Sequence, residues 1–210
     1  MIGQYEAETG EETRRRTPVA IPPAQTPSGA KLSLHENRFG SLELEMRAVH
    51  LFNRMGSPCS EIASGDPLEV QIDFFARGPI HTPMFGITIS NEDNQKCCEL
   101  TSRDGGFELP RVDGCGSVIL RIDRLDLTPG QYHLDAGVYE TNWAYAYDYH
   151  WHAYKLAVTG TGKGKSIMSP PHSWQIGLSA GNDSAFASTA AQSQTHDCLR
   201  PVRVAIRVDT

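Results

Sequence analysis

Five stretches in which apolar and polar residues alternate limit the fold of this chain more than any other feature of its sequence. Alternation with a period of two places every second side chain on the same face of a β-strand, so one face of each strand is apolar. The five stretches are residues 42–51, 68–74, 85–89, 118–122 and 132–138. Within the first, the apolar phase shifts after Met46, as a β-bulge would shift it. Because turn residues separate the stretches and no amphipathic helical period accompanies them, we predict an all-β protein, an antiparallel β-sandwich.

The segments that flank this pattern differ from it in composition and suggest how the chain is organised. Residues 1–36 contain several prolines and a basic cluster within an acidic stretch, and we expect a linker there. Residues 37–160 form the predicted sandwich domain. Residues 161–198 are mostly small and polar, so we expect a second, flexible linker. Residues 199–210 return to strict alternation and predict a C-terminal strand.

The net charge and the cysteine content indicate which binding partners and which cellular compartment the protein can have. The 210 residues carry a net charge of −6 and the pI is about 5.7, which argues against binding to nucleic acid. Five cysteines, an odd number, without a secretory signal pattern fit a reduced, cytoplasmic protein. No apolar run approaches the roughly 20 residues that cross a bilayer. We therefore expect a cytoplasmic protein that does not bind nucleic acid.

Aromatic residues are concentrated in residues 139–158, which hold five of the seven tyrosines and two of the three tryptophans. Tyr154 fits a core-facing phase, whereas the row from Trp143 to Trp151 alternates in the other phase, partly within an expected loop over residues 140–148. Surface aromatic rings suit the C–H faces of sugars, and polar neighbours suit sugar hydroxyls. The residues predicted to contact carbohydrate are Trp143, Tyr145, Tyr147, Asp148, Tyr149, Trp151 and His133. Core packing and contact with a partner protein are the alternatives for this row.

Histidines in and beside this segment raise the alternative of a metal site. His150 and His152 are two positions apart, so a regular strand would place both imidazoles on one face, and His133 could complete a three-histidine site. The glutamate that follows the His-x-His pair in cupin-type sites is missing, and the sequence has no CxxC pair. The sequence also lacks an ATP-binding loop and a nucleophile elbow. We therefore expect no metal, no cofactor and no catalysis, with a metal-dependent β-sandwich enzyme as the alternative.

Four short motifs occur in an order that indicates a family. They are Gly65-Asp66, Pro83 to Gly86 followed by an acidic turn, Leu127 to Leu134, and Asp148 at the start of the last strand of the sandwich. Through these motifs, residues 40–160 resemble the C-terminal carbohydrate-binding domain of Wzt-type ATP-binding subunits, which export O-antigen polysaccharide. The extension beyond residue 160 departs from the family pattern. No sugar-binding residue is transferred from the family, because its sugar contacts vary with the glycan.

The resemblance implies an immunoglobulin-like sandwich that binds the end of a lipid-linked O-antigen-type polysaccharide, a step in lipopolysaccharide biosynthesis. It implies that residues 1–36 follow an ATPase domain, absent from this sequence. That domain would contact the membrane subunit of the ABC transporter at the cytoplasmic side of the inner membrane. The resemblance also implies a homodimer in which the strand of residues 200–209 is exchanged between partners. The alternative is that this strand folds back onto its own subunit.

Overall fold

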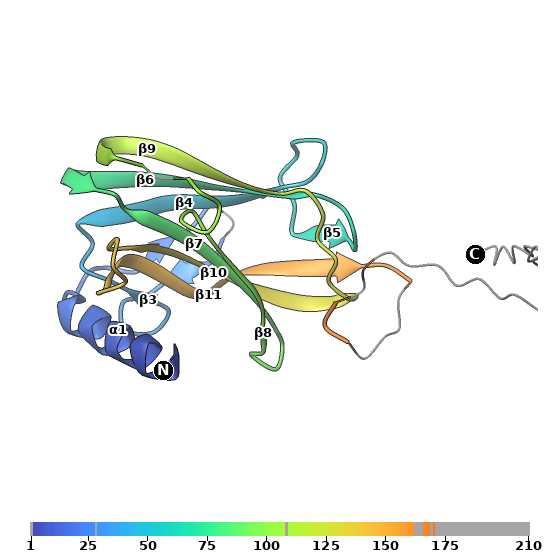
Figure 1. Cartoon of the computed structure of the whole chain (residues 1–210), viewed down its shortest axis with the longest axis horizontal. Coiled ribbons are helices and arrows are strands. Elements are labelled where there is room, and N and C mark those ends of the chain that lie inside the picture. Colours follow the sequence, from blue (N-terminus) through green and yellow to red (C-terminus); the bar gives the residue numbers. More distant parts are fainter. Residues whose placement is uncertain (1, 28, 108, 162–165, 169, 171–210) are drawn as a thin grey trace, which may run out of the picture. The chain divides into compact units, whose positions relative to one another are not determined.

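The expected antiparallel β-sandwich is confirmed by the computed structural model, which describes residues 2–27, 29–107, 109–161, 166–168 and 170. The elements are α1 (Ile2–Arg16), β1 (Ala24–Gln25), β2 (Lys31–Leu32), β3 (Arg38–Phe39), β4 (Leu44–Phe52), β5 (Glu61–Ala63), β6 (Leu68–His81), β7 (Met84–Asn91), β8 (Lys96–Thr101), β9 (Arg111–Ile122), β10 (Gly130–Tyr139) and β11 (Ala146–Thr159). The larger sheet has the strand order β3-β11-β10-β7-β8, with β5 beside β11. The smaller has the order β4-β6-β9, and the two sheets lie face to face (Figure 1).

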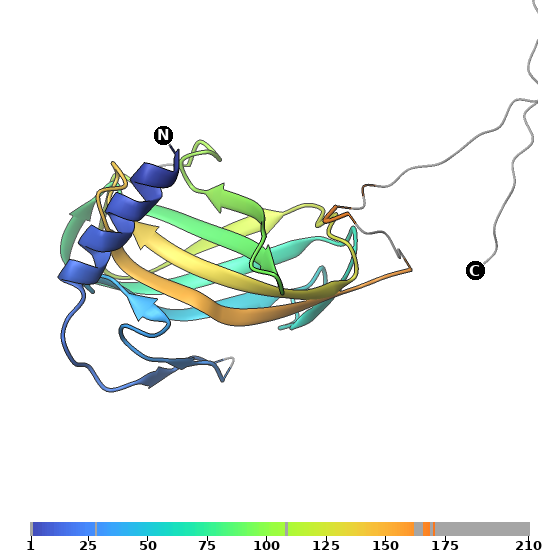
Figure 2. The ribbon, with the colours of Figure 1, turned by 90° about the horizontal axis from the view of Figure 1, so that it is seen from below.

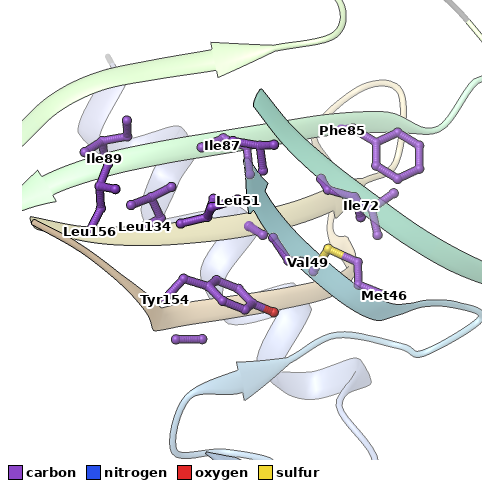
Figure 3. Packing of buried hydrophobic residues seen from close by; sticks show 14 of the residues in the cluster. Met46, Val49, Leu51, Ile72, Phe85, Ile87, Ile89, Leu134, Tyr154 and Leu156 are labelled. Atoms are coloured by element: carbon purple, nitrogen blue, oxygen red, sulfur yellow. The ribbon is translucent and has the colours of Figure 1, made fainter. Parts of the chain in front are cut away.

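Apolar side chains from both sheets fill the space between them (Figure 3). They come mainly from alternate positions of each strand, as the period of two predicts. The labelled members of this core are Met46, Val49, Leu51, Ile72, Phe85, Ile87, Ile89, Leu134, Tyr154 and Leu156. The expected bulge is present, because the pairing of β4 with β6 shifts between Met46 and Ala48. In each sheet, one set of alternate side chains is therefore buried in the core, and the other set faces away from the core and is available for further contacts.

Helix α1 lies within the segment expected to be a linker, so that expectation is corrected. The second half of α1 is rich in helix-forming glutamate and arginine, and Glu12 forms ion pairs with Arg15 and Arg16. Among the described side chains of α1 and of the residue that follows it, the buried ones are the threonines Thr13 and Thr17. The apolar stripe by which an amphipathic helix is recognised is therefore missing from the sequence. No helix in the described part of the chain is long and apolar enough to cross a membrane.

The expectations for the C-terminal part are only partly covered by described residues. Of the linker over residues 161–198, residues 161, 166–168 and 170 are described, and Met168 forms an isolated bridge with Leu127. The predicted strand of residues 199–210, with its proposed exchange between subunits, lies outside the described residues.

Candidate functional site

The larger sheet has an outward face, formed by the side chains that alternate with its core residues. In β10, Leu134 points into the core, so Asp135 and Gly137 lie on the outward face. Strand pairing places Gly137 opposite Gly86 of β7 and Tyr149 of β11. Figure 2 views this sheet from its outward side and shows α1 crossing one end of it.

Three aromatic rings lie together where β10 ends. The ring of Tyr139 is 4.7 Å from that of Trp143 and 6.2 Å from that of Tyr149, measured between centroids. A Cβ atom on Gly137 would collide with the phenol of Tyr139, and one on Gly86 would lie 3.5 Å from the same ring. The two glycines therefore let this ring lie close to the sheet. Burial raises the pKa of Tyr139 and of Tyr149, so both hydroxyls remain protonated at neutral pH and can donate hydrogen bonds.

A second group on the outward face consists of one indole and two imidazoles in a stack. The ring centroid of Trp151 lies 4.5 Å from that of His152. The His152 ring lies 4.8 Å from that of His133, with an interplanar angle of 13°. Trp151 is 44% exposed, so a large apolar ring meets solvent at the end of this stack.

An irregularity in β11 produces the stack. Pairing with β10 passes from Leu134–Tyr154 to Ala136–His150, so β11 advances four positions while β10 advances two. His152 lies within the extra length and has a φ of 48°, in the left-handed region that favours glycine. As a result, His150 is buried in the core, whereas His152 joins the rings of the outward face.

Asp135 lies between the two groups of rings. Its carboxylate accepts a 2.7 Å hydrogen bond from the Tyr149 hydroxyl and a 2.6 Å hydrogen bond from the backbone N–H of His152. Burial, the largest effect, raises the pKa of Asp135, although both hydrogen bonds oppose the shift. Asp135 therefore connects the phenol of one group to the irregular part of β11 that carries the other.

The raised pKa of Asp135 gives a prediction for Asp135→Asn. A folded-state pKa above the unfolded value of about 3.9 means that the carboxyl contributes its full stabilisation only below that value. The contribution is lost as the pH rises through the folded-state pKa. We therefore expect the parent chain to lose stability relative to Asp135→Asn as the pH rises from about 3.5 to 7. Urea unfolding of both proteins across this range checks the prediction, and a difference that stays constant or shifts in favour of the parent contradicts it.

Asp148 lies in the interior and not on the surface loop where the sequence suggested a carbohydrate contact, which corrects that prediction. It is 0% exposed. Its carboxylate accepts hydrogen bonds from Arg38 Nη2 at 2.6 Å, from Arg38 Nε at 2.9 Å and from the backbone N–H of Met46 at 2.9 Å. Burial alone would raise the pKa of Asp148, but the neighbouring His150 and the bonded Arg38 outweigh it and lower the pKa. Asp148 belongs to β11 of the larger sheet and Met46 to β4 of the smaller sheet. Their hydrogen bond therefore connects the two sheets, at the bulge of β4.

Tyr145 and Tyr147 also lie away from the outward face. The loop predicted over residues 140–148 ends early, because β11 begins at Ala146. Tyr147 is buried in the core and packs edge-on against the half-buried Tyr145, with ring centroids 5.3 Å apart. A register shift at the end of β10 changes the phase of β11 here, so the odd-numbered row does not form one face. The predicted contacts that lie on the outward face or at its edge are Trp143, Tyr149, Trp151 and His133.

Three residues of the outward face, Asp135, Tyr139 and His152, are missing from the set predicted by sequence. Asp135 and Tyr139 continue the odd-numbered phase of residues 132–138, and this phase is the signal that could have identified them. His152 carries only a metal-ligand prediction. Its position on the outward face depends on the irregularity of β11, which the sequence does not reveal.

The three-histidine metal site does not form in this structure. His150 lies on the core side, where its Nδ1 is 2.8 Å from the Tyr154 hydroxyl, whereas His133 and His152 stack on the outward face. The expectation that His150 and His152 share a face is wrong, because β11 is irregular between them. Within the described residues, no group of three or more His, Cys, Asp or Glu side chains is placed to hold a metal ion.

Two depressions in the surface do not resemble sugar sites. One, of about 50 Å³, is lined by residues that include Met84, Arg103, Phe107 and Thr141. The other, of about 280 Å³, is lined by Pro18, Ile21, Ser41, Leu42, Glu43 and Arg77, none of which is aromatic. Neither depression groups several aromatic rings with buried polar groups, as the outward face does.

Comparison with known proteins indicates a family and a related fold. The model of a family described as the Wzt C-terminal domain matches residues 35–169. A solved structure, the crystal structure of the C-terminal domain of wzt, is 17% identical to this chain with a TM-score of 0.59, and the match covers 67% of this chain and 88% of that one. At this identity the likeness shows a shared fold. No curated protein matches the chain.

Two solved structures of the CARDB domain of PF1109 from Pyrococcus furiosus are more distant. The solution NMR structure is 11% identical with a TM-score of 0.31, and the match covers 55% of this chain and 94% of that one. The crystal structure in complex with di-metal ions is 10% identical with a TM-score of 0.30, and the match covers 55% and 91%. These TM-scores are too low to support any conclusion about this chain.

Proposed function

The chain belongs to the Wzt C-terminal domain family, and from this premise we propose that it binds the end of a lipid-linked O-antigen-type polysaccharide for export. The family is one of non-catalytic domains of ABC transporter ATP-binding subunits. Within that subunit, the domain would bind the glycan in the cytoplasm, next to the inner membrane. The ATPase domain would connect it to the membrane subunit, and lipopolysaccharide biosynthesis is the process served.

The observation that carries this proposal is the combination of aromatic rings with hydrogen-bonding groups on the outward face. Trp151 presents an indole that is 44% exposed at one end of the face. Tyr139 and Trp143 form the other group of rings, with Asp135 between the groups. Sugar rings have apolar C–H faces that pack on indole and phenol, and their hydroxyls need polar partners nearby. The outward face supplies both kinds of contact on one rigid sheet.

The ionisation of these groups suits a ligand rich in hydroxyls. Burial, with smaller effects from His152 and Lys155, lowers the pKa of His133. At neutral pH its imidazole is therefore uncharged, with one nitrogen that donates and one that accepts a hydrogen bond. The Asp135 carboxylate and the Tyr149 hydroxyl, whose proton is donated to Asp135, add further acceptors. Such mixed groups match hydroxyls, which also donate and accept.

Calorimetric titration of the purified chain with bacterial O-polysaccharides of defined structure tests the proposal. We expect at least one of them to bind saturably with one site per chain. A dephosphorylated, lipid-free glycan should suffice, because the proposed contacts are to sugar rings and hydroxyls. Saturable binding of a protein from the same transporter, with no binding of any glycan, would instead assign the outward face to protein contact.

We also propose that the domain is a two-fold homodimer. Strand β9 has 12 residues and pairs only with β6 among the described strands, so none of them covers its other edge. Long unpaired edges favour association, and the alternating residues 200–209 have the composition of a strand that could cover one. Those residues lie outside the described part of the chain, so their pairing with a partner's sheet rests on sequence pattern and family.

Deletion of residues 198–210 is expected to convert the dimer to a monomer. Light scattering of both proteins at equal concentration measures the mass, and far-UV circular dichroism verifies that the truncated sandwich remains folded. A truncated chain that stays dimeric would contradict the exchange of the strand. A monomeric parent chain would likewise contradict the exchange and would favour the alternative that the strand folds back onto its own subunit.

A further inference from the structure

Helix α1 forms hydrogen bonds with the backbone of the loop that carries Trp143. The Thr9 hydroxyl donates a 2.7 Å hydrogen bond to the carbonyl oxygen of Trp143. The Thr13 hydroxyl accepts a 2.9 Å hydrogen bond from the backbone N–H of Ala146. The two threonines are four residues apart and so lie on the same side of the helix. They therefore hold the loop between β10 and β11 at two points, on either side of Tyr145.

Further contacts fix α1 at the same place. The guanidinium of Arg16 lies 3.9 Å from the centroid of the Tyr145 ring, between the two hydrogen-bonded points in sequence. The Thr17 hydroxyl, just beyond α1, accepts a 2.9 Å hydrogen bond from the backbone N–H of Gly40, which follows β3. Helix α1 is thus docked by directional contacts to backbone groups, which fix its position more narrowly than an apolar contact would.

The loop needs such support because of the conformation of Trp143. Its φ of 61° lies in the left-handed region, which is unfavourable for a residue with a bulky side chain and persists where the surroundings hold it. Two backbone hydrogen bonds within the loop support the turn, from Trp143 N–H to the Glu140 carbonyl at 2.9 Å and from Glu140 N–H to the Tyr145 carbonyl at 3.0 Å. The bond from Thr9 fixes the next peptide group. The docked helix therefore contacts the backbone directly beside the Trp143 ring, which packs against Tyr139.

We propose that α1 is a positioning element of the glycan site, which sets the orientation of Trp143 so that docking of α1 and occupancy of the site strengthen each other. The proposal rests on the proposed function, since it takes the outward face as the glycan site. If docked α1 favours the Trp143 position that binds sugar, then bound sugar must favour docked α1 by the same factor. Glycan binding would then stabilise the docked position of α1, which is far in sequence from the rings that hold the sugar.

The double variant Thr9→Val/Thr13→Val tests this with little change in side-chain shape. We expect the affinity for a glycan that binds the parent to fall about tenfold, since two hydrogen bonds that order the loop are lost. The control is Thr159→Val at the far end of β11, where the threonine hydroxyl donates a 3.3 Å hydrogen bond to the Ile62 carbonyl. This control loses a similar bond and should bind like the parent. In the parent, saturating glycan should slow hydrogen exchange of the α1 amides.

Two outcomes would overturn the proposal: equal affinities of the double variant and the parent, or α1 exchange that glycan leaves unchanged. Absence of glycan binding by the parent would count against the proposed function. In that case a second measurement tests whether α1 positions Trp143. The indole N–H signal of Trp143 in NMR spectra should shift in the double variant, while that of Trp151 stays in place. A Trp143 signal identical in parent and variant would show that α1 does not position the ring.

Discussion

Asp148→Ala is expected to lower the unfolding free energy by about 3–5 kcal/mol, the cost of leaving a buried charge without its partner. The charge is the guanidinium of Arg38, which is 7% exposed and donates two hydrogen bonds to Asp148. Glu45 lies farther from Arg38, at 3.5 Å, and its other carboxylate oxygen is bonded to Arg77, so it replaces the lost carboxylate only in part. The variant also removes the acceptor for the Met46 N–H at the bulge of β4.

Chemical denaturation at neutral pH measures this loss, with Glu69→Ala as the matched control. Glu69 forms an ion pair with Arg121 at 2.8 Å on the surface, where such pairs contribute about 1 kcal/mol or less. Since the pKa of Asp148 is lowered, its stabilisation is present above the unfolded pKa of about 3.9 and is lost as the pH falls through the folded-state pKa. Equal losses for the two variants would show that Asp148 is not the structural link between the sheets.

Removal of both tryptophans of the site, Trp143→Ala with Trp151→Ala, is expected to weaken glycan binding by about 1–3 kcal/mol. This estimate assigns about 0.5–1.5 kcal/mol to each ring and corresponds to a loss of affinity of roughly 5- to 150-fold. The fold should be little affected, because Trp151 is exposed and Trp143 lies in a loop outside the core cluster. Calorimetry of parent and variant with the same glycan measures the change.

Phe75→Ala is the matched control for this experiment. Phe75 is a half-buried aromatic residue of β6 on the outer side of the smaller sheet, where its ring lies 5.1 Å from the Arg47 guanidinium. Its loss removes a surface ring without touching the proposed site, so binding should match the parent. If the tryptophan variant retains the affinity of the parent, stacking on the outward face is not how the chain holds a glycan.

The sandwich could be predicted because apolar and polar residues alternate along most of its strands, and this alternation identifies the buried face. The bulge of β4 could be predicted as well, since the apolar residues change from even to odd positions after Met46. Strand β11 lacks such a pattern between Ala146 and His152. Its two phases hold tyrosine, tryptophan and histidine, which are amphipathic and fit either side of a sheet. The irregularities that place Tyr147 and Asp148 inside are therefore invisible in the sequence.

The arrangement of the site and the presence of helix α1 could not be predicted from the sequence, for different reasons. The grouping of Asp135 with Tyr149 and His152 depends on which positions of β10 and β11 face each other, and a single sequence does not specify that register. Helix α1 docks through threonine hydroxyls, so it lacks the apolar period on which helix prediction depends. In both cases hydrogen bonds between distant segments, and not local pattern, decide the structure.

NMR mapping shows most directly whether glycan binds on the outward face of the larger sheet. Backbone amide and indole N–H signals would be recorded while the chain is titrated with an O-polysaccharide that binds it. We expect the largest shifts on Asp135, Tyr149 and His152 and on the indole of Trp151, with signals of β6 and β9 unchanged, as binding on the outward face requires. Shifts concentrated on β6 and β9, around Phe75 and Ile119 on the outer side of the smaller sheet, would contradict it.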